Sequence, residues 1–207
     1  TFNNLLGGVY MALMDPYGLE LFPVEIWGVV LAVSSTGFII GGAVVAAKGL
    51  GRNPIRTLLL AVALMGVLGA VFTLRDWWWL YAGGIWLYMM LIPVVESAEQ
   101  TVIQKVVPFE KQGRVFGAAA TFEAGAAPIT AFLIAPIAQF WVIPYMETDA
   151  GRGAWGWLLG EGQGRGIALV FLVSGLGMVV LAALAFTTRS YRILSREYTE
   201  VPAGEGD

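Results

Sequence analysis

Long apolar runs separated by short polar turns dominate the pattern of this chain of 207 residues. A helix needs about 20 mainly apolar residues to cross a bilayer, because it rises about 1.5 Å per residue through roughly 30 Å of hydrocarbon. Runs of that length occupy residues 3–22, 26–47, 55–74, 77–104, 113–145 and 166–187. They lack the alternation of barrel strands, and only helices or closed barrels satisfy the backbone in lipid. The pattern therefore predicts an all-α, polytopic membrane protein with six transmembrane helices.

Prolines and loop composition add detail to these spans. Asp15 and Pro16 interrupt the first run, which is the weakest of the six. The fifth run is longer than a bilayer requires, and Pro128 and Pro136 favour a bend within it. We expect residues 1–188 to form one transmembrane bundle and residues 189–207 to be a disordered cytoplasmic tail. The loop 147–165 contains a short apolar stretch, which lies in the outer headgroup layer or belongs to a disordered loop.

Lysine and arginine indicate the direction of the spans. Nine of the 12 bases lie in the turns after the second, fourth and sixth runs, and three lie in the other turns. Because basic turns stay on the cytoplasmic side, both termini are expected to be cytoplasmic and the membrane to be the plasma (inner) membrane. Trp77, Trp78 and Trp79 agree with an outer interface, where aromatic side chains gather.

Composition excludes several classes of protein. The chain is 57% hydrophobic and 13% charged, with a mean hydropathy of +0.73, whereas soluble domains have about 25% charged residues. A net charge of −3 indicates no nucleic-acid partner. Without cysteine or histidine, neither a metal site nor a cofactor is expected, and the commonest general base is missing. No GxxxxGK[ST] loop supports an ATP-driven pump, and only Glu96 and Glu99 offer a carboxylate pair, so we do not expect an enzyme.

Glu123 is the ionisable residue expected to lie deepest in the membrane. It follows Gly113 by ten residues, which corresponds to about 15 Å of helix and hence to the region of the midplane. Hydrocarbon favours the neutral form of a carboxyl group, so this residue could bind and release a proton. We expect it to couple transport to an ion or to contact substrate. The alternative is a protonated, hydrogen-bonded structural residue.

A second polar group lies toward the end of the fourth run. Glu96 and Gln100 share a helix face, and Glu99 follows by three residues. The two glutamates are expected to form inner-gate ion pairs with bases of the cytoplasmic turns, namely Arg52, Arg56 and Arg114. The alternative is ordinary interfacial charge that reaches water.

The remaining polar positions have structural alternatives. Gln100, Asn4 and Asp15 are candidates to line a cavity, but Asp15 could instead cap or kink its helix and Asn4 could mark the start of one. Small residues should let helices approach closely at Gly37 and Gly41, which form a GxxxG motif, and along the run from Gly117 to Ala126.

Three stretches carry a resemblance to a known family. They are GGAVVAAKGLGRNPIRTLL (41–59), ESAEQTVIQKVVPFEKQGRVFGAAATFE (96–123) and GRGIALVFLVSGLG (164–177). In them the chain resembles the C-terminal six-helix half of a major facilitator superfamily transporter of the bacterial macrolide-efflux-like branch. It departs from the family where Ala47 and Lys48 replace the usual acidic residue before the basic turn.

The resemblance implies a fold of two inverted three-helix repeats, with an N-terminal six-helix half as partner. It also implies that residues 117–136 form a half-to-half or cavity-lining surface. The function expected is secondary active transport, in the form of proton-coupled efflux of amphipathic small molecules by an antiporter-type permease. A lone carboxylate could bind either a proton or a sodium ion as the coupling ion. The alternative is a structural or assembly membrane module, or a half-transporter that acts only with a partner half.

Overall fold

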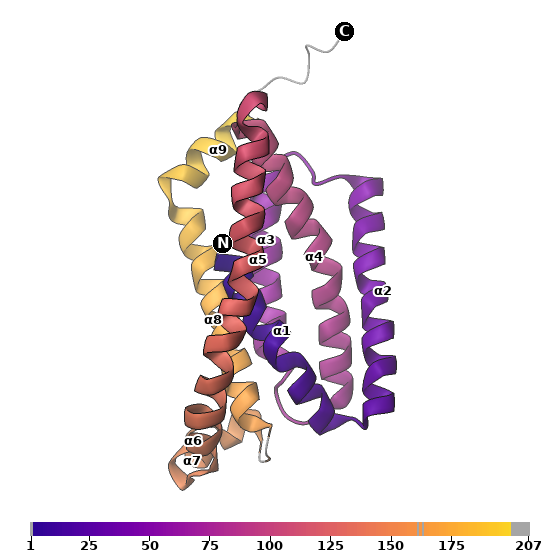
Figure 1. Ribbon diagram of the computed structural model, residues 1–207, viewed down its shortest axis with the longest axis vertical. Coiled ribbons are helices and arrows are strands. Elements are labelled where there is room, and N and C mark those ends of the chain that lie inside the picture. Colours follow the sequence, from indigo (N-terminus) through magenta and orange to yellow (C-terminus); the bar gives the residue numbers. More distant parts are fainter. Residues whose placement is uncertain (1, 161, 163, 200–207) are drawn as a thin grey trace.

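The protein is a bundle of long helices (Figure 1). The computed structural model describes the backbone of residues 2–160, 162 and 164–199, and the side chains in these ranges except those of residues 2–6, 123, 127, 197 and 199. The long helices are α1 (Phe2–Leu21), α2 (Val24–Lys48), α3 (Pro54–Val71), α4 (Trp78–Val106), α5 (Phe109–Ile137) and α8 (Arg165–Thr187). The shorter ones are the π-helical turn η1 (Ala138–Val142), α6 (Ile143–Glu147), α7 (Asp149–Leu159) and α9 (Arg189–Thr199). No strand occurs among the described residues, which confirms the all-α prediction.

Five helical segments of the described chain are long enough and apolar enough to cross a membrane. They are α2, α3, α4, α8 and the continuous segment from α5 through η1 and α6. The helix α1 covers the predicted first span without ending at Pro16, but it is not one of these five. The sixth membrane crossing therefore stays a prediction.

The bundle has two chemically different ends. The α2–α3 turn, the α4–α5 turn and α9 lie at one end, which we call the basic end because it carries the nine bases grouped above. The α1–α2 and α3–α4 connections and α6–α7 lie at the opposite end (Figure 1). Along the length, α2 packs on α4, α3 packs on α4 and α8, and α1 packs on α5 and α8.

The core is aromatic and lies between α1, α3, α4 and α8. Tyr10 of α1 stacks on Phe171 of α8 with ring centroids 5.1 Å apart, and its hydroxyl donates to the Phe171 carbonyl oxygen over 3.2 Å. Tyr17 and Tyr81 meet edge to face at 4.8 Å, and both are fully buried. Large apolar side chains also cover the outside of the bundle, as a lipid-facing surface requires; examples are Val29, Val33, Leu64 and Val173.

Glycine contacts explain how closely the helices approach. A Cβ on Gly37 or Gly41 would overlap the carbonyl oxygen of Trp86 or Met90, so these glycines let α2 lie against the α4 backbone. The close approach predicted for the GxxxG motif is therefore confirmed. Nothing lies within 4 Å of a Cβ built on Gly117 or Gly125, so the close packing expected there is not found at these two glycines.

A second close crossing was not anticipated from the sequence. Gly66 of α3 and Gly175 of α8 each face the other's carbonyl oxygen, which brings these two helices into contact in the middle of the bundle. Neither glycine belongs to a GxxxG motif, so only the packing identifies this pair.

The structure changes or adds to the sequence expectations in three segments. The expected tail is helical over Arg189–Thr199, because Thr188 accepts a hydrogen bond from the backbone N–H of Tyr191 and so caps α9; residues 200–207 lie outside the described part. The loop 147–165 contains the helix α7, which Thr148 caps. Pro128 lies inside α5 without ending it, whereas the π-helical turn η1 begins two residues after Pro136.

Candidate functional site: a cavity in the basic half of the bundle

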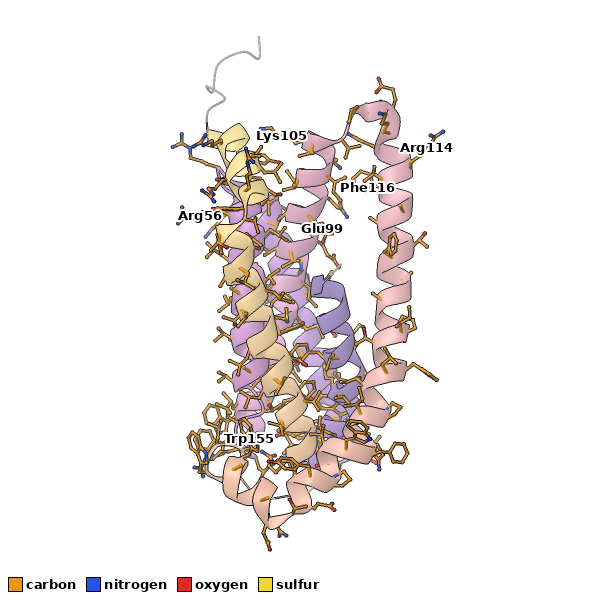
Figure 2. The ribbon with its side chains drawn as sticks, turned by 90° about the vertical axis from the view of Figure 1, so that its left-hand side faces the viewer. Arg56, Glu99, Lys105, Arg114, Phe116 and Trp155 are labelled. Atoms are coloured by element: carbon orange, nitrogen blue, oxygen red, sulfur yellow. The ribbon has the colours of Figure 1, made fainter. Side chains whose placement is uncertain are left out.

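A cavity of about 610 Å³ lies between α1, α3, α4 and α5. Its apolar wall contains Met11, Met65, Tyr88, Ile92 and Phe116, and its polar wall contains Glu96, Glu99 and Gln100. Figure 2 shows Glu99 on α4 and Phe116 on α5 at the two sides of the space between these helices. The lining residues of α5 and most of those of α4 come from the halves nearer the basic end, whereas Tyr88 lies just beyond the middle of α4. The volume suits a drug-sized molecule, since ligand pockets measure roughly 300–1,000 Å³.

One face of α4 forms the polar wall. Tyr88, Ile92, Glu96, Glu99 and Ile103 recur at steps of three or four residues, so they stack along one side of the helix. The sequence correctly placed Glu96 and Gln100 on a shared face, and the structure turns that face toward the cavity. Gln100, a predicted cavity-lining candidate, therefore does line it.

Small residues form the facing wall on α5. Ala119 and Ala120 line the cavity together with Phe116, and Gly7 and Gly8 line it from α1. The helix α5 packs on α1 rather than on α4, which leaves room beside α4. At the basic end, Gln112 closes the α4–α5 turn by donating to the carbonyl oxygens of Gln104 and Val107, each over 3.0 Å.

The cavity wall is acidic. Glu96 and Glu99 are its charged lining residues, and no lysine or arginine lines it in the part of the chain that the structure describes. Glu96 is exposed and Glu99 is half-buried, so both lie within reach of a molecule in the cavity. The arrangement can therefore hold a positively charged group beside an apolar, partly aromatic surface.

The three predicted inner-gate bases lie elsewhere. Arg52 lies in the α2–α3 turn, Arg56 in the first turn of α3 and Arg114 in the second turn of α5, and all three are exposed. Figure 2 shows Arg56 and Arg114 on opposite sides of the bundle, both pointing away from Glu99. The structure thus brings the two carboxylates to one cavity, whereas α5 stands apart from α4 and carries Arg114 outward.

The other candidates divide into two groups. Asp15 is exposed and accepts a hydrogen bond from the Trp27 indole N–H over 2.9 Å, so it ties α1 to α2 outside the cavity. The side chains of Glu123 and Asn4 lie outside the described residues. The backbone of Glu123 is part of α5, one helical turn beyond Ala119 and Ala120.

A buried arginine at the opposite end was missed by sequence reasoning, which counted it only as a loop base. Arg165, the first residue of α8, is 2% exposed and ion-pairs with Asp76 of the α3–α4 connection. It also donates to the Tyr17 hydroxyl over 2.8 Å and to the carbonyl oxygens of Thr73 and Leu159. The available signal was a base directly before the most apolar run, with Asp76 in another turn at the same end.

The other two bases at this end are also bonded. Arg152 lies 3.6 Å from Asp149 and donates to the Glu147 carbonyl oxygen over 2.6 Å. Arg75 donates to the Trp157 carbonyl oxygen over 3.2 Å, which attaches α7 to the α3–α4 connection. The opposite end is therefore cross-linked by hydrogen bonds, whereas the cavity lies in the basic half.

No group of three metal-ligating side chains occurs among the residues that were described. Comparison with known proteins identified no relative: no family model matches the chain, and no curated protein or solved structure matches it significantly.

Proposed function

We propose that the chain is a six-helix half of a secondary active transporter of the major facilitator type, which moves amphipathic small molecules across the plasma (inner) membrane. The observation that carries the proposal is the acidic and apolar cavity between α1, α3, α4 and α5, in a bundle with five helical segments able to cross a membrane. A transporter needs such a site at the interface of its repeats.

The packing of the helices supports an inverted repeat. In an inverted repeat α1, α2 and α3 would correspond to α4, α5 and α8, respectively. Under this correspondence the contact of α2 with α4 matches the contact of α5 with α1. The contact of α3 with α4 likewise becomes that of α8 with α1, and the contact of α3 with α8 maps onto itself. The two sets run in opposite directions, since α1 runs toward the opposite end and α4 runs away from it (Figure 1). This pattern is typical of inverted-topology repeats.

The cavity chemistry favours cationic amphipathic substrates. Tyr88 and Phe116 offer apolar surfaces with π-faces, and Glu96 and Glu99 offer negative charge at one side of them. A charged substrate group gains more from a carboxylate in a cavity partly shielded from water than at an exposed surface. We assign the coupling role to Glu123, whose backbone position is one turn beyond the small residues of the cavity wall.

The exposed face of α5 supports a partner half. Phe122, Ile129 and Phe132 are 69%, 57% and 79% exposed and fall on one side of α5 at steps of seven and three residues. In the proposal a second six-helix unit, in the same polypeptide or in another, covers this face and closes the cavity. Rocking of the two units would then expose the cavity to each side of the membrane in turn.

Flux measurements in vesicles test the proposal. The protein, reconstituted with the unit that completes it, should move a fluorescent cationic amphiphile against its gradient when a pH gradient is imposed, and an ionophore should abolish the movement. Glu123→Gln should bind the compound normally but lose the response to the pH gradient, with Glu110→Gln as the matched control in α5. Flux in Glu123→Gln that still follows the pH gradient would refute this role for Glu123, and the absence of any gradient-driven flux in the native protein would refute transport.

The orientation is tested separately, in a chain that has no native cysteine. A cysteine at Gln112 should resist an impermeant thiol reagent added outside intact cells, and a cysteine at Gly153 should react with it. The reverse labelling pattern would invert the proposed topology.

A further inference from the structure

The helix α9 has two faces of different chemistry. Arg189, Arg192 and Arg196 recur at steps of three and four residues on one face, which also contains Ile193, and all four are exposed, Ile193 by 53%. The other face contains Tyr191, Leu194, Ser195 and Tyr198, which are half-buried against the bundle. The exposed face thus carries positive charge around an apolar side chain, as in helices that lie on membrane surfaces.

The inner face of α9 is attached to three membrane-spanning segments. Ser195 accepts a hydrogen bond over 2.7 Å from Asn53, the residue that caps α3. Lys105, near the end of α4, lies 4.0 Å above the centre of the Tyr198 ring. Tyr191 packs edge to face on Phe186, at the end of α8, with ring centroids 5.0 Å apart.

These attachments determine the depth of α9. Asn53, Lys105 and Phe186 belong to the ends of three helices that are able to cross a membrane, and these ends lie at the same end of the bundle. The helix begins two residues after α8 ends, so it starts at the boundary of the hydrocarbon. The headgroup layer beyond this boundary is roughly 5–8 Å deep, half the difference between the full bilayer and its core. A helix held at this level has its exposed face among the lipid headgroups.

We propose that the exposed face of α9 binds the phosphates of anionic phospholipids in the leaflet at the basic end. The inference rests on the membrane location included in the proposed function, but not on transport. Arginine guanidinium groups pair with phosphate oxygens through two parallel hydrogen bonds, and Ile193 would insert between acyl chains. Arg56, exposed in the helix that Asn53 caps, extends the charge toward α3 (Figure 2).

Native mass spectrometry of the full chain in detergent tests the proposal, with phosphatidylglycerol and phosphatidylcholine offered together. The native protein should retain phosphatidylglycerol in preference to phosphatidylcholine. Each base near an anionic surface contributes roughly fivefold in binding, so Arg189→Gln with Arg192→Gln should weaken retention about tenfold or more. Lys111→Gln with Arg114→Gln removes the same charge from the same end on α5 and should change retention less than about twofold.

Three results would overturn the proposal. Equal loss in both double variants would show a general charge effect, and unchanged retention in the α9 variant would show that lipid binds elsewhere. Displacement of the lipid by millimolar inorganic phosphate or glycerol phosphate would identify a site for the free anion rather than for lipid. None of these results depends on flux, so they leave the transport proposal standing.

A second measurement keeps all the arginines in place. A fluorophore attached at Ile193→Cys should shift its emission to shorter wavelength in phosphatidylglycerol vesicles relative to phosphatidylcholine vesicles, and high salt should reverse the shift. The same label at Gln112→Cys should respond equally to both lipids. Equal emission of the position-193 label in both vesicle types would contradict the proposal.

Discussion

Arg165 at the start of α8 donates a hydrogen bond over 2.8 Å to the hydroxyl of Tyr17 in α1, 148 residues earlier in the chain. The same guanidinium pairs with Asp76, so one buried side chain joins α1, α8 and the α3–α4 connection. Its hydrogen bond to the Leu159 carbonyl oxygen attaches the end of α7 to the same cluster. This residue holds the end of the bundle that lies away from the cavity.

Loss of Arg165 should therefore destabilise the fold. Arg165→Gln leaves the carbonyl oxygens of Thr73 and Leu159 without their buried donor and should lower the free energy of unfolding by about 3–5 kcal/mol. Asp76→Asn should cost less, because the Asp76 side chain is 55% exposed and water can replace part of its contact. Denaturant unfolding in detergent measures both, with Arg152→Gln, whose side chain is 55% exposed, as the surface control. Equal stability of the Arg165 and Arg152 variants would contradict the assignment.

Two adjacent glycines should respond oppositely to alanine. At Gly41 an added methyl group overlaps the Met90 backbone, so Gly41→Ala should destabilise the protein by about 1–3 kcal/mol through overpacking. At Gly42 nothing lies within 4 Å of an added Cβ, so Gly42→Ala should be neutral or stabilise by up to about 1 kcal/mol. Thermal unfolding of the two variants in one detergent compares them directly. A similar change in both would mean that α2 does not approach α4 at Gly41.

Filling the cavity should prevent binding without unfolding the protein. Ala119 lines the cavity and Ala118, its neighbour, does not. Ala119→Trp should weaken binding of a fluorescent cationic amphiphile at least about tenfold, because the indole occupies volume that the ligand needs, whereas Ala118→Trp should leave it unchanged. Equilibrium fluorescence titration gives the two affinities, and the melting temperatures confirm that both variants fold. Equal affinities would place the ligand outside this cavity.

The two cavity carboxylates should distinguish charged from neutral ligands. Removing both charges with Glu96→Gln and Glu99→Gln should weaken binding of a cationic amphiphile by about 1.5–3 kcal/mol, the usual range for a hydrogen bond to a charged group, or roughly tenfold to a hundredfold. A neutral analogue of the same shape should lose less than about twofold. Titration of both ligands gives the ratio, and Glu110→Gln, exposed at the start of α5, is the control. An equal loss for the two ligands would show that the variants alter the shape of the cavity rather than its charge.

Sequence reasoning was most successful where one helix alone decides the outcome. The apolar runs predict the long helices because length and composition are local properties. The structure places each run in a helical segment with similar limits, the fifth in the continuous segment from α5 through η1 and α6. The shared face of Glu96 and Gln100 follows from helical periodicity alone. The GxxxG motif of Gly37 and Gly41 does not identify the helix that it contacts. It did correctly predict the surface of α2 on which another helix, α4, packs closely.

The hydrophobic pattern by itself determined the all-α class, the positions of the long helices and the grouping of nine bases at one end. Only the tertiary structure decided that Arg165 is a buried residue that links several helices, rather than an exposed charge in a loop. It likewise decided that Arg114 points away from Glu99. It also decided that α5 packs on α1 and leaves a cavity beside α4. The physical reason is range: helix formation depends on neighbours within a few turns. The pairing of a guanidinium with a carboxylate, and the packing of one helix on another, depend on contacts between segments far apart in the chain.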